Sequence, residues 1–336
     1  MNFVYFSHLP YEINDQHYLL AAATRAGNKA AYVEWTRDCR IFVDDEVAAT
    51  LPRWSSPRRV AETVYGLIGR ERTILVDGMA TKTSLASFLF PKPTKDSVRI
   101  YGVFDDYRYD KTGLRLLRFH IAEQLVRARN DYTWIFNADI QPRYPDAIFV
   151  DNASYLTPNP AVRDADPSRV VYVGSIDLRA DLSLLDKIAT ANPDLQIDIH
   201  GAVKKGYVEF DKLVAAHPNI HYFGKWQERD FPAILARYRI GLIPYKADHR
   251  LTKYISSSKM YHYLNCGLEV ITTPFPQVRT YKDYVHVLNS ADDWAQVYRE
   301  ALTQPRAPNW PYEKFLWDAR WRELCDAVER RERAAG

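Results

Sequence analysis

The sequence predicts an α/β protein built from two doubly wound, largely parallel sheets, and three observations support this prediction. Short apolar runs alternate with helix-length segments, which is typical of parallel strands covered by helices on both faces. The alternation stops at a proline-rich polar stretch and then begins again. The 336 residues exceed one ordinary core and suit two domains. We therefore expect two Rossmann-like domains facing a cleft, where α/β proteins bind ligands.

In the first half, six apolar runs predict strands and two longer segments predict helices. The strands are expected at 3–6, 30–35, 72–77, 98–104, 132–137 and 147–150, and the helices at 16–26 and 112–129. Gly27 ends the first of these helices. The second helix is apolar around much of its circumference, so both a buried and a surface position stay open for it.

The second half repeats the pattern after a linker at 157–168. Strands are expected at 169–173, 195–200, 220–223, 240–244 and 269–272, and helices at 182–191, at 231–238 and after Ser258. The chain beyond 292 is expected to be helical, with a proline-rich break before a last helix at 312–331. We expect domains at 1–160 and 161–305, with 306–336 crossing back to the first.

Bulk composition excludes several classes of protein. The formal charge of +3 gives no general case for a nucleic-acid binder. The three cysteines, at 39, 266 and 325, lack metal-ligand spacing and suit a reducing compartment. The amino terminus shows no signal-peptide pattern, and no apolar stretch approaches the roughly 20 residues that span a bilayer. These features predict a cytoplasmic protein.

A polar Ser-Ser-Ser-Lys stretch, from Ser256 to Lys259, runs directly into a short helical pattern that stops at Gly267. A helix amino terminus offers unpaired N–H groups and a partial positive charge, so hydroxyls and a lysine placed there suit a diphosphate. The alternative is a simple N-cap, because serine is favoured at that position. Three hydroxyls and a lysine exceed what capping needs, so the stretch predicts a phosphate site.

Five motifs of the second half occur together in the order and spacing of GT-B glycosyltransferases. They lie at 171–175, 192–197, 218–224, 240–245 and 258–267. The chain resembles bacterial GT-B enzymes of family 4 or of the teichuronic-acid-transferase-like kind. The resemblance is close over about 170–275 and looser in the first half, and 316–320 is similar to the closing helix of these enzymes. It implies a nucleotide diphosphate bound by the second domain and an acceptor bound mainly by the first.

The resemblance also implies which residues bind the donor. Ser257, Ser258 and Lys259 match the diphosphate contacts, and His262 replaces the ribose-binding glutamate. The remaining donor-site candidates are Gly174 and Ser175 after the first strand of the domain, Arg179, Lys204 and Lys205 in neighbouring loops, Tyr245 as a packing surface for the base, and Tyr254. Cations suit such a site because negative charge builds on the leaving phosphate as the sugar bond breaks.

The departures from the family concern the mechanism. Retaining family 4 enzymes carry two glutamates eight positions apart, whereas these positions are Tyr254 and His262 here. The motif is also similar to that of the inverting glucuronosyltransferase of xanthan assembly. Inverting transfer needs a general base, and the candidates are Asp105, Asp106, His120, His8 and Glu12. Capping competes with the base role for the two aspartates, and a core position is favoured for His120.

We therefore expect transfer of a sugar, most simply from a UDP-sugar, to a saccharide or lipid-linked acceptor in cell-envelope polysaccharide synthesis. No cofactor, metal or nucleic acid is expected. A nucleotide-sugar 2-epimerase and a catalytically degenerate nucleotide-sugar-binding protein are the alternatives. The span 53–129 has 15 Lys and Arg against 8 Asp and Glu. That excess predicts peripheral contact with an anionic membrane, at the inner face of the cell membrane, through Arg53, Trp54, Arg58, Arg59, Arg115, Arg118, Arg127 and Arg129.

Overall fold

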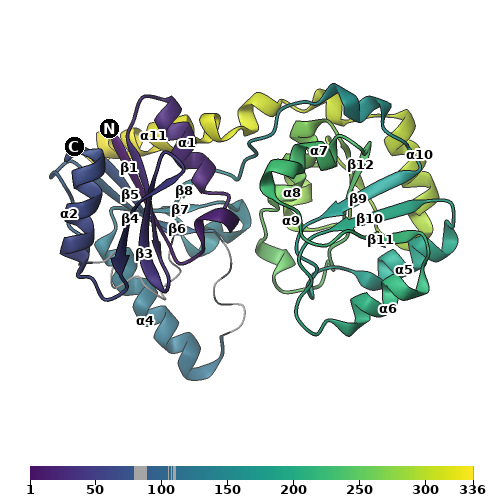
Figure 1. Ribbon diagram of the computed structural model, residues 1–336, viewed down its shortest axis with the longest axis horizontal. Coiled ribbons are helices and arrows are strands. Elements are labelled where there is room, and N and C mark those ends of the chain that lie inside the picture. Colours follow the sequence, from purple (N-terminus) through teal and green to yellow (C-terminus); the bar gives the residue numbers. More distant parts are fainter. Residues whose placement is uncertain (79–88, 105, 107, 109–110, 336) are drawn as a thin grey trace. The chain divides into compact units, whose positions relative to one another are not determined.

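The computed structural model describes residues 1–78, 89–104, 106, 108 and 111–335. The chain divides into two compact α/β units (Figure 1). Unit 1 comprises Met1–Asp151 with Trp317–Gly336, and unit 2 comprises Asn152–Leu316. The divisions at 151/152 and 316/317 differ from the expected 160/161 and 305/306. Segment 152–160 belongs to unit 2 because it is hydrogen-bonded there: Asn159 N–H donates to the Cys266 carbonyl at 3.1 Å.

Unit 1 contains an eight-stranded sheet in the order β4-β3-β2-β1-β5-β6-β7-β8 within its described residues. Six strands are parallel: β1 (Asn2–Ser7), β2 (Ala30–Trp35), β5 (Thr73–Asp77), β6 (Val98–Val103), β7 (Tyr132–Ile135) and β8 (Ile148–Phe149). All of β1 is buried, as the continuous apolar run of a central parallel strand requires. The sheet confirms the predicted α/β class and carries the carboxyl ends of β1, β5 and β6 to one edge.

The sequence prediction missed an antiparallel hairpin at one side of this sheet. It consists of β3 (Asp38–Val43) and β4 (Glu46–Pro52). The turn between them uses Asp44 and Asp45 at φ 51° and 65°, the left-handed pair that a two-residue hairpin turn needs. Asp-Asp is a weaker turn signal than Asn-Gly, so the hairpin was hidden in the sequence.

Helices cover both faces of the unit 1 sheet. Val4 and Phe6 of β1 pack toward α2 (Pro57–Ile68), in a cluster that includes Val60 and Val64. Phe3, which alternates with them, meets Trp321 of α11 (Trp317–Ala335) at a ring distance of 5.0 Å. Helix α1 (His17–Arg25) packs beside α11. The two faces of β1 are therefore buried by helices that lie far apart in the sequence.

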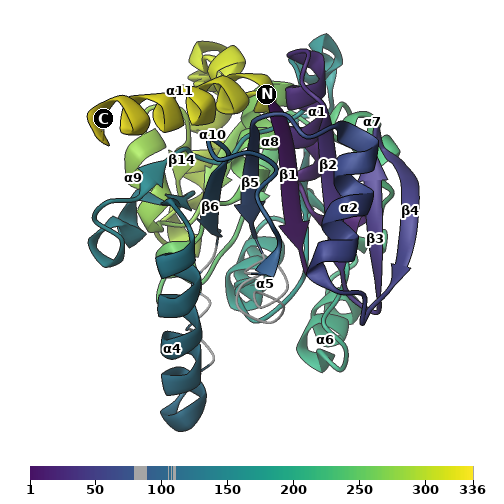
Figure 2. The same cartoon turned by 90° about the vertical axis from the view of Figure 1, so that its left-hand side faces the viewer.

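Helix α4 (Gly113–Arg129) stands out from the rest of unit 1 (Figure 2). It buries Phe119, Glu123 and Val126, while Leu114, Leu117 and Leu125 are exposed and Leu116 is half-buried. The open question of its position is therefore answered in favour of the surface. His120 is half-buried, so the interpretation of this residue as a core histidine was wrong. None of the helices in the described ranges is both long and apolar enough to cross a membrane.

Unit 2 contains a parallel sheet in the order β11-β10-β9-β12-β13-β14. Its strands are β9 (Arg169–Val173), β10 (Gln196–His200), β11 (Ile220–Tyr222), β12 (Ile240–Ile243), β13 (Glu269–Thr272) and β14 (His286–Val287). One face packs on α7 (Phe231–Leu235), α8 (Ser258–Cys266) and α9 (Pro276–Tyr281), and the other on α5 (Leu182–Ala191), α6 (Val208–Ala216) and α10 (Trp294–Thr303). This arrangement confirms the predicted doubly wound half.

Candidate functional site

The loops that follow β9, β10 and β12 are joined by backbone hydrogen bonds at the carboxyl edge of the unit 2 sheet. Ile176 N–H donates to the Ala202 carbonyl at 2.9 Å, which ties the loop after β9 to the loop after β10. Asp181 N–H donates to the Pro244 carbonyl at 2.7 Å and ties the first loop to the segment after β12. Three separate loops thus form one surface, at the edge where parallel sheets place ligands.

Two glycines allow these loops to approach one another. Gly174 has φ +143°, and a Cβ atom there would lie 2.0 Å from Lys259 Cε. Gly201 has φ +149°, and a Cβ atom there would lie 1.9 Å from the backbone oxygen of Gly174. Backbone conformation disfavours a side chain at both positions, and at Gly201 the neighbouring backbone also leaves no space for one. The close approach at Gly174 is to Lys259, and its contact with the donor stays a prediction.

Helix α8 begins at the same edge, where its first turn is open to an anion. Ser257 is the N-cap residue, but within the described residues its side chain makes no capping bond. Its own N–H is occupied by Gln277 Oε1 at 2.8 Å. Met260 N–H donates to the Ser257 carbonyl at 3.2 Å, while the N–H groups of Ser258 and Lys259 precede the intrahelical bonds and are the ones that face an anion. Simple capping therefore does not explain the serines, and the helix ends as predicted at Gly267, with φ 97°.

Lys259 lies beside two tyrosines. Its Nζ donates to the Tyr245 hydroxyl at 2.8 Å and lies 5.8 Å from the centre of the Tyr172 ring. Arg179 approaches from the loop after β9, and Asp177 holds it with Nε–Oδ1 at 3.0 Å and Nη2–Oδ2 at 2.6 Å. Two of its five donors are used in this way, which leaves the guanidinium oriented with further donors available.

These cations change the ionisation of Tyr245, which is buried. Burial alone raises the pKa of a phenol, but Lys259 and Arg179 outweigh it, so the pKa of Tyr245 lies below its ordinary value. Burial raises the pKa of Asp177 less than Arg179 and Lys259 lower it, so this carboxyl has a pKa below its ordinary value. The carboxyl edge of the unit 2 sheet is therefore electropositive, and its two acidic side chains, Tyr245 and Asp177, each lie beside a cation.

The other predicted donor residues are distributed around this cluster. Ser175, Lys204 and Lys205 are exposed in the tied loops. Tyr254 is half-buried, with Lys253 Nζ 5.5 Å from its ring centre. His262 is buried, with Nδ1 2.8 Å from Ser154 Oγ. The buried ring of Tyr245 presents its hydroxyl to Lys259 and exposes little of its face. The contacts of Tyr245 with the nucleobase and of His262 with the ribose stay predictions.

Sequence reasoning missed four residues that support or border this site. Asp177 holds Arg179, Gln277 holds the Ser257 N–H, and the Tyr263 hydroxyl accepts a bond from Val173 N–H at 2.8 Å. Phe223 is 48% exposed after β11 and stacks on His200 with a ring distance of 4.7 Å. The Asp-x-Arg spacing of 177 and 179 was a local signal, whereas the other contacts join positions far apart in the sequence.

The candidate bases of unit 1 already have structural partners. Asp106 is buried and accepts a bond from Arg143 Nη1 at 2.9 Å, and Arg108 N–H donates to the same carboxylate at 3.2 Å. Glu12 is exposed and pairs with Arg40 at 3.3 Å. His8 follows β1 at the carboxyl edge of the sheet, and His120 lies on α4. Asp105 lies outside the described residues.

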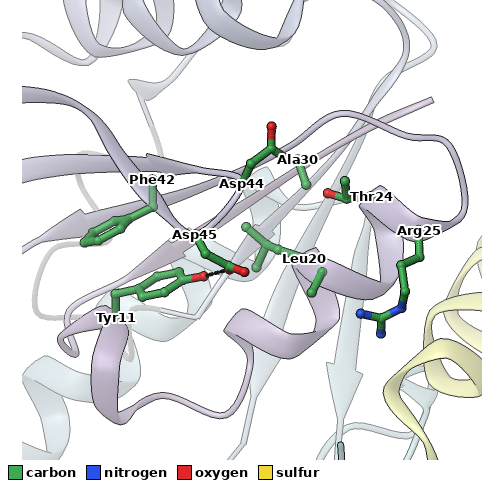
Figure 3. Close-up of a pocket in the computed structure, with 9 residues that line it drawn as sticks. Tyr11, Leu20, Thr24, Arg25, Ala30, Phe42, Asp44 and Asp45 are labelled. Atoms are coloured by element: carbon green, nitrogen blue, oxygen red, sulfur yellow. Dashed lines mark hydrogen bonds between the residues drawn. The ribbon is translucent and has the colours of Figure 1, made fainter. Parts of the chain in front are cut away.

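Unit 1 also contains a hollow of about 240 Å³ (Figure 3). Its lining comes from α1, the turn between β3 and β4, and neighbouring positions: Tyr11, Leu20, Ala21, Thr24, Arg25, Ala30, Phe42, Asp44 and Asp45. Arg25 is held by Asp318 through two hydrogen bonds of 2.8 and 2.7 Å. Of the catalytic candidates that the structure describes, Asp106, His120, His8 and Glu12, none lines this hollow.

Comparison with known proteins identifies the fold. The chain is similar to Anabaena Alr3699/HepE, solved in complex with UDP, with a TM-score of 0.71 and 11% identity over 98% of this chain and 100% of that one. TarM has a TM-score of 0.60 and 9% identity over 86% of this chain and 60% of its own. The pneumococcal O-GlcNAc transferase GtfA, in complex with UDP and GlcNAc, has a TM-score of 0.54 and 11% identity over 88% and 64%.

No model of a protein family matches the chain, and no curated protein sequence matches it. At these identities the structural likeness establishes the fold alone. The two α/β units with parallel sheets are those of the GT-B fold, as the sequence motifs predicted.

Proposed function

We propose that the chain is a glycosyltransferase that transfers a sugar from a UDP-sugar to a hydroxyl of a saccharide or lipid-linked acceptor in cell-envelope polysaccharide assembly. The observation that carries the proposal is the position of Lys259, held by Tyr245 against Gly174 at the open first turn of α8. Such a combination of a fixed cation and a helix amino terminus suits a diphosphate. The likeness to HepE and GtfA, each solved with UDP, supports a UDP-sugar.

The proposed reaction uses unit 2 for the leaving group. The acceptor oxygen forms a bond to the anomeric carbon while the bond from that carbon to the donor phosphate breaks, and its electron pair leaves with UDP. Lys259, Arg179 and the N–H groups of α8 stabilise the negative charge that develops on the phosphate oxygens. The acceptor proton passes to a base, for which Asp105, Asp106, His8, Glu12 and His120 are our candidates. We assign no metal to this step.

Exposed Phe223 extends the proposal to the nucleobase of the donor. Its ring lies at the carboxyl edge of β11, and its stacking on His200 fixes its orientation. An aromatic face presented in this way can stack on a pyrimidine. We propose that Phe223, rather than buried Tyr245, packs on the uracil.

The experiment that tests the function is UDP release from a panel of UDP-sugars, with and without added saccharide acceptors. Acceptor-dependent release is expected. Conversion of the donor to its epimer without acceptor would instead indicate an epimerase. UDP binding without turnover would indicate a binding protein. Absence of both binding and release across the panel would contradict the proposal.

A further inference from the structure

Helix α4 has two apolar faces, and only one is covered. Phe119 and Val126 pack into unit 1. On the opposite side, Leu114, Leu117, Ile121 and Leu125 follow one another at spacings of three and four and form a continuous line, the apolar stripe. Their exposed fractions are 72%, 55%, 55% and 55%. Scattered exposed leucines are ordinary, but an aligned row of four is a contact surface.

Arginines border this stripe on one side. Arg115, Arg118 and Arg129 are exposed, and their spacings of three and eleven residues turn them in similar directions on the helix. We name them the arginine rim. The one acidic residue of the helix, Glu123, is buried and bound by Arg108. The surface that α4 presents is therefore apolar and cationic, without an exposed carboxylate of its own.

A cationic hollow continues this surface at the carboxyl end of α4. It has a volume of about 650 Å³ and shares Arg129 with the rim. Its other charged lining residues are Lys92, Lys95, Arg99 and Asp131. Lys92 neutralises Asp131 at 2.7 Å, which leaves the hollow with an excess of positive charge. Burial and the nearby Arg129 lower the pKa of Arg99, as expected where cations are crowded together.

Charge complementarity selects the partner. A row of leucines bordered by arginines matches an anionic lipid surface, where the apolar side chains enter the acyl boundary and the guanidinium groups meet phosphates. A second copy of the chain fits less well, because two stripes packed as an antiparallel symmetric pair bring arginine rims of like charge to the same side. We propose that α4 lies in the interface of an anionic bilayer, with the apolar stripe inserted and the rim and hollow at the headgroups.

This proposal does not depend on glycosyl transfer, because binding to vesicles can be measured without donor or turnover. The probes are vesicles of phosphatidylcholine and vesicles in which about a third of the lipid is phosphatidylglycerol. Cosedimentation of the full chain with the second kind only is expected. Raising NaCl from about 0.1 to about 0.5 M should weaken it severalfold. Equal sedimentation with both kinds, or with neither, overturns the proposal.

Variants locate the contact. Leu117→Gln with Ile121→Gln should reduce vesicle binding on the order of tenfold, and Arg115→Gln with Arg118→Gln should do the same. The matched controls remove equivalent exposed groups elsewhere: Leu67→Gln with Val208→Gln, and Arg229→Gln with Arg330→Gln. They should bind as the unchanged protein does. Vesicle binding that survives both α4 variants would show that another surface is used and would overturn the assignment.

A label reports insertion directly. Ile121→Cys in a Cys325→Ser background can carry an environment-sensitive fluorophore, because the remaining cysteines, Cys39 and Cys266, are buried. A blue shift with anionic vesicles is expected at this position and not at Val208→Cys on α6. Light scattering by the protein without lipid tests the competing partner. A concentration-dependent dimer that the Leu117→Gln, Ile121→Gln variant abolishes, together with no blue shift, would assign the stripe to a second copy.

Discussion

The carboxyl edges of the two sheets differ in what their polar residues do. In unit 2, loops from three strands are hydrogen-bonded to each other, and Lys259 lies against Gly174 with its Nζ donating to the Tyr245 hydroxyl. In unit 1, the described candidate acids are engaged: Asp106 with Arg143, and Glu12 with Arg40. A glycine that the backbone conformation requires, with a lysine packed against it, indicates a ligand site. A carboxylate that follows a strand can equally well have a purely structural role.

The largest expected effect is a loss of stability when a backbone-constrained glycine of unit 2 is replaced. Gly201→Ala places a Cβ atom 1.9 Å from the Gly174 oxygen at φ +149°. Backbone strain and overpacking together should cost about 4 kcal/mol. Gly206→Ala is the control, because Gly206 also has positive φ, +75°, but no atom within 4 Å of the added carbon. Thermal unfolding should separate the two variants, and equal stability would contradict the close packing of the loops.

The second prediction asks whether Asp106 is structural. Asp106→Asn breaks a buried ion pair and should lower the free energy of unfolding by about 3 kcal/mol. Arg143→Gln removes the other partner and should act similarly, with the double variant no worse than the sum. Urea unfolding measures all three. If Asp106→Asn retains full stability but loses turnover at saturating donor, the carboxylate is the base and the contrast between the units fails.

The third prediction concerns the cation of unit 2. Lys259→Ala should weaken UDP binding about 100-fold, or about 2.7 kcal/mol, with stability retained. Gly174→Ala should approach this loss, because its Cβ displaces the flexible end of Lys259. Exposed Lys204→Ala serves as the matched control and should change affinity severalfold at most. Calorimetric titration with UDP provides the measurement, and equal losses for Lys204→Ala and Lys259→Ala would contradict the assignment.

A smaller effect is expected where one residue acts through another. Asp177→Asn weakens the bidentate contact that orients Arg179. We expect about a tenfold fall in kcat/KM, mainly in kcat if Arg179 acts on the leaving phosphate. Asp177→Glu should restore part of it. A change in KM alone would assign Arg179 to ground-state binding.

The smallest effect is expected at Tyr245. Tyr245→Phe removes one hydrogen bond to Lys259 and should cost about 1 kcal/mol of UDP affinity. Because the folded-state pKa of Tyr245 lies below its ordinary value, ionisation of this phenol adds stability that is present above the ordinary pKa and is lost as pH falls through the lowered one. Tyrosinate absorbance should show an early step that Tyr245→Phe removes. In Lys259→Ala the step should move to higher pH, since burial remains.

Local sequence signals predicted much of unit 2. Strands 169–173 and 269–272 and helix 182–191 have the predicted bounds, because a buried strand or an amphipathic helix flanked by breakers is determined within a few residues. The start of α8 and its glycine stop were predicted for the same reason.

What the sequence could not provide is the pairing of distant side chains. Periodicity could not decide which face of α4 is covered, because both faces are apolar. Tyr263 reaches the N–H of Val173 across ninety positions, and Gln277 reaches Ser257 across twenty. The Arg143 partner of Asp106 likewise comes from another segment, so the sequence left open whether this residue is a base or has a structural role.

The affinities of uridine, UMP and UDP for the unchanged protein test the central claim most directly, because they probe the diphosphate site without altering it. Calorimetry at one ionic strength should show binding that tightens with each phosphate, with UDP about 100-fold tighter than uridine. Uridine binding as tightly as UDP would contradict a diphosphate site at Lys259 and α8.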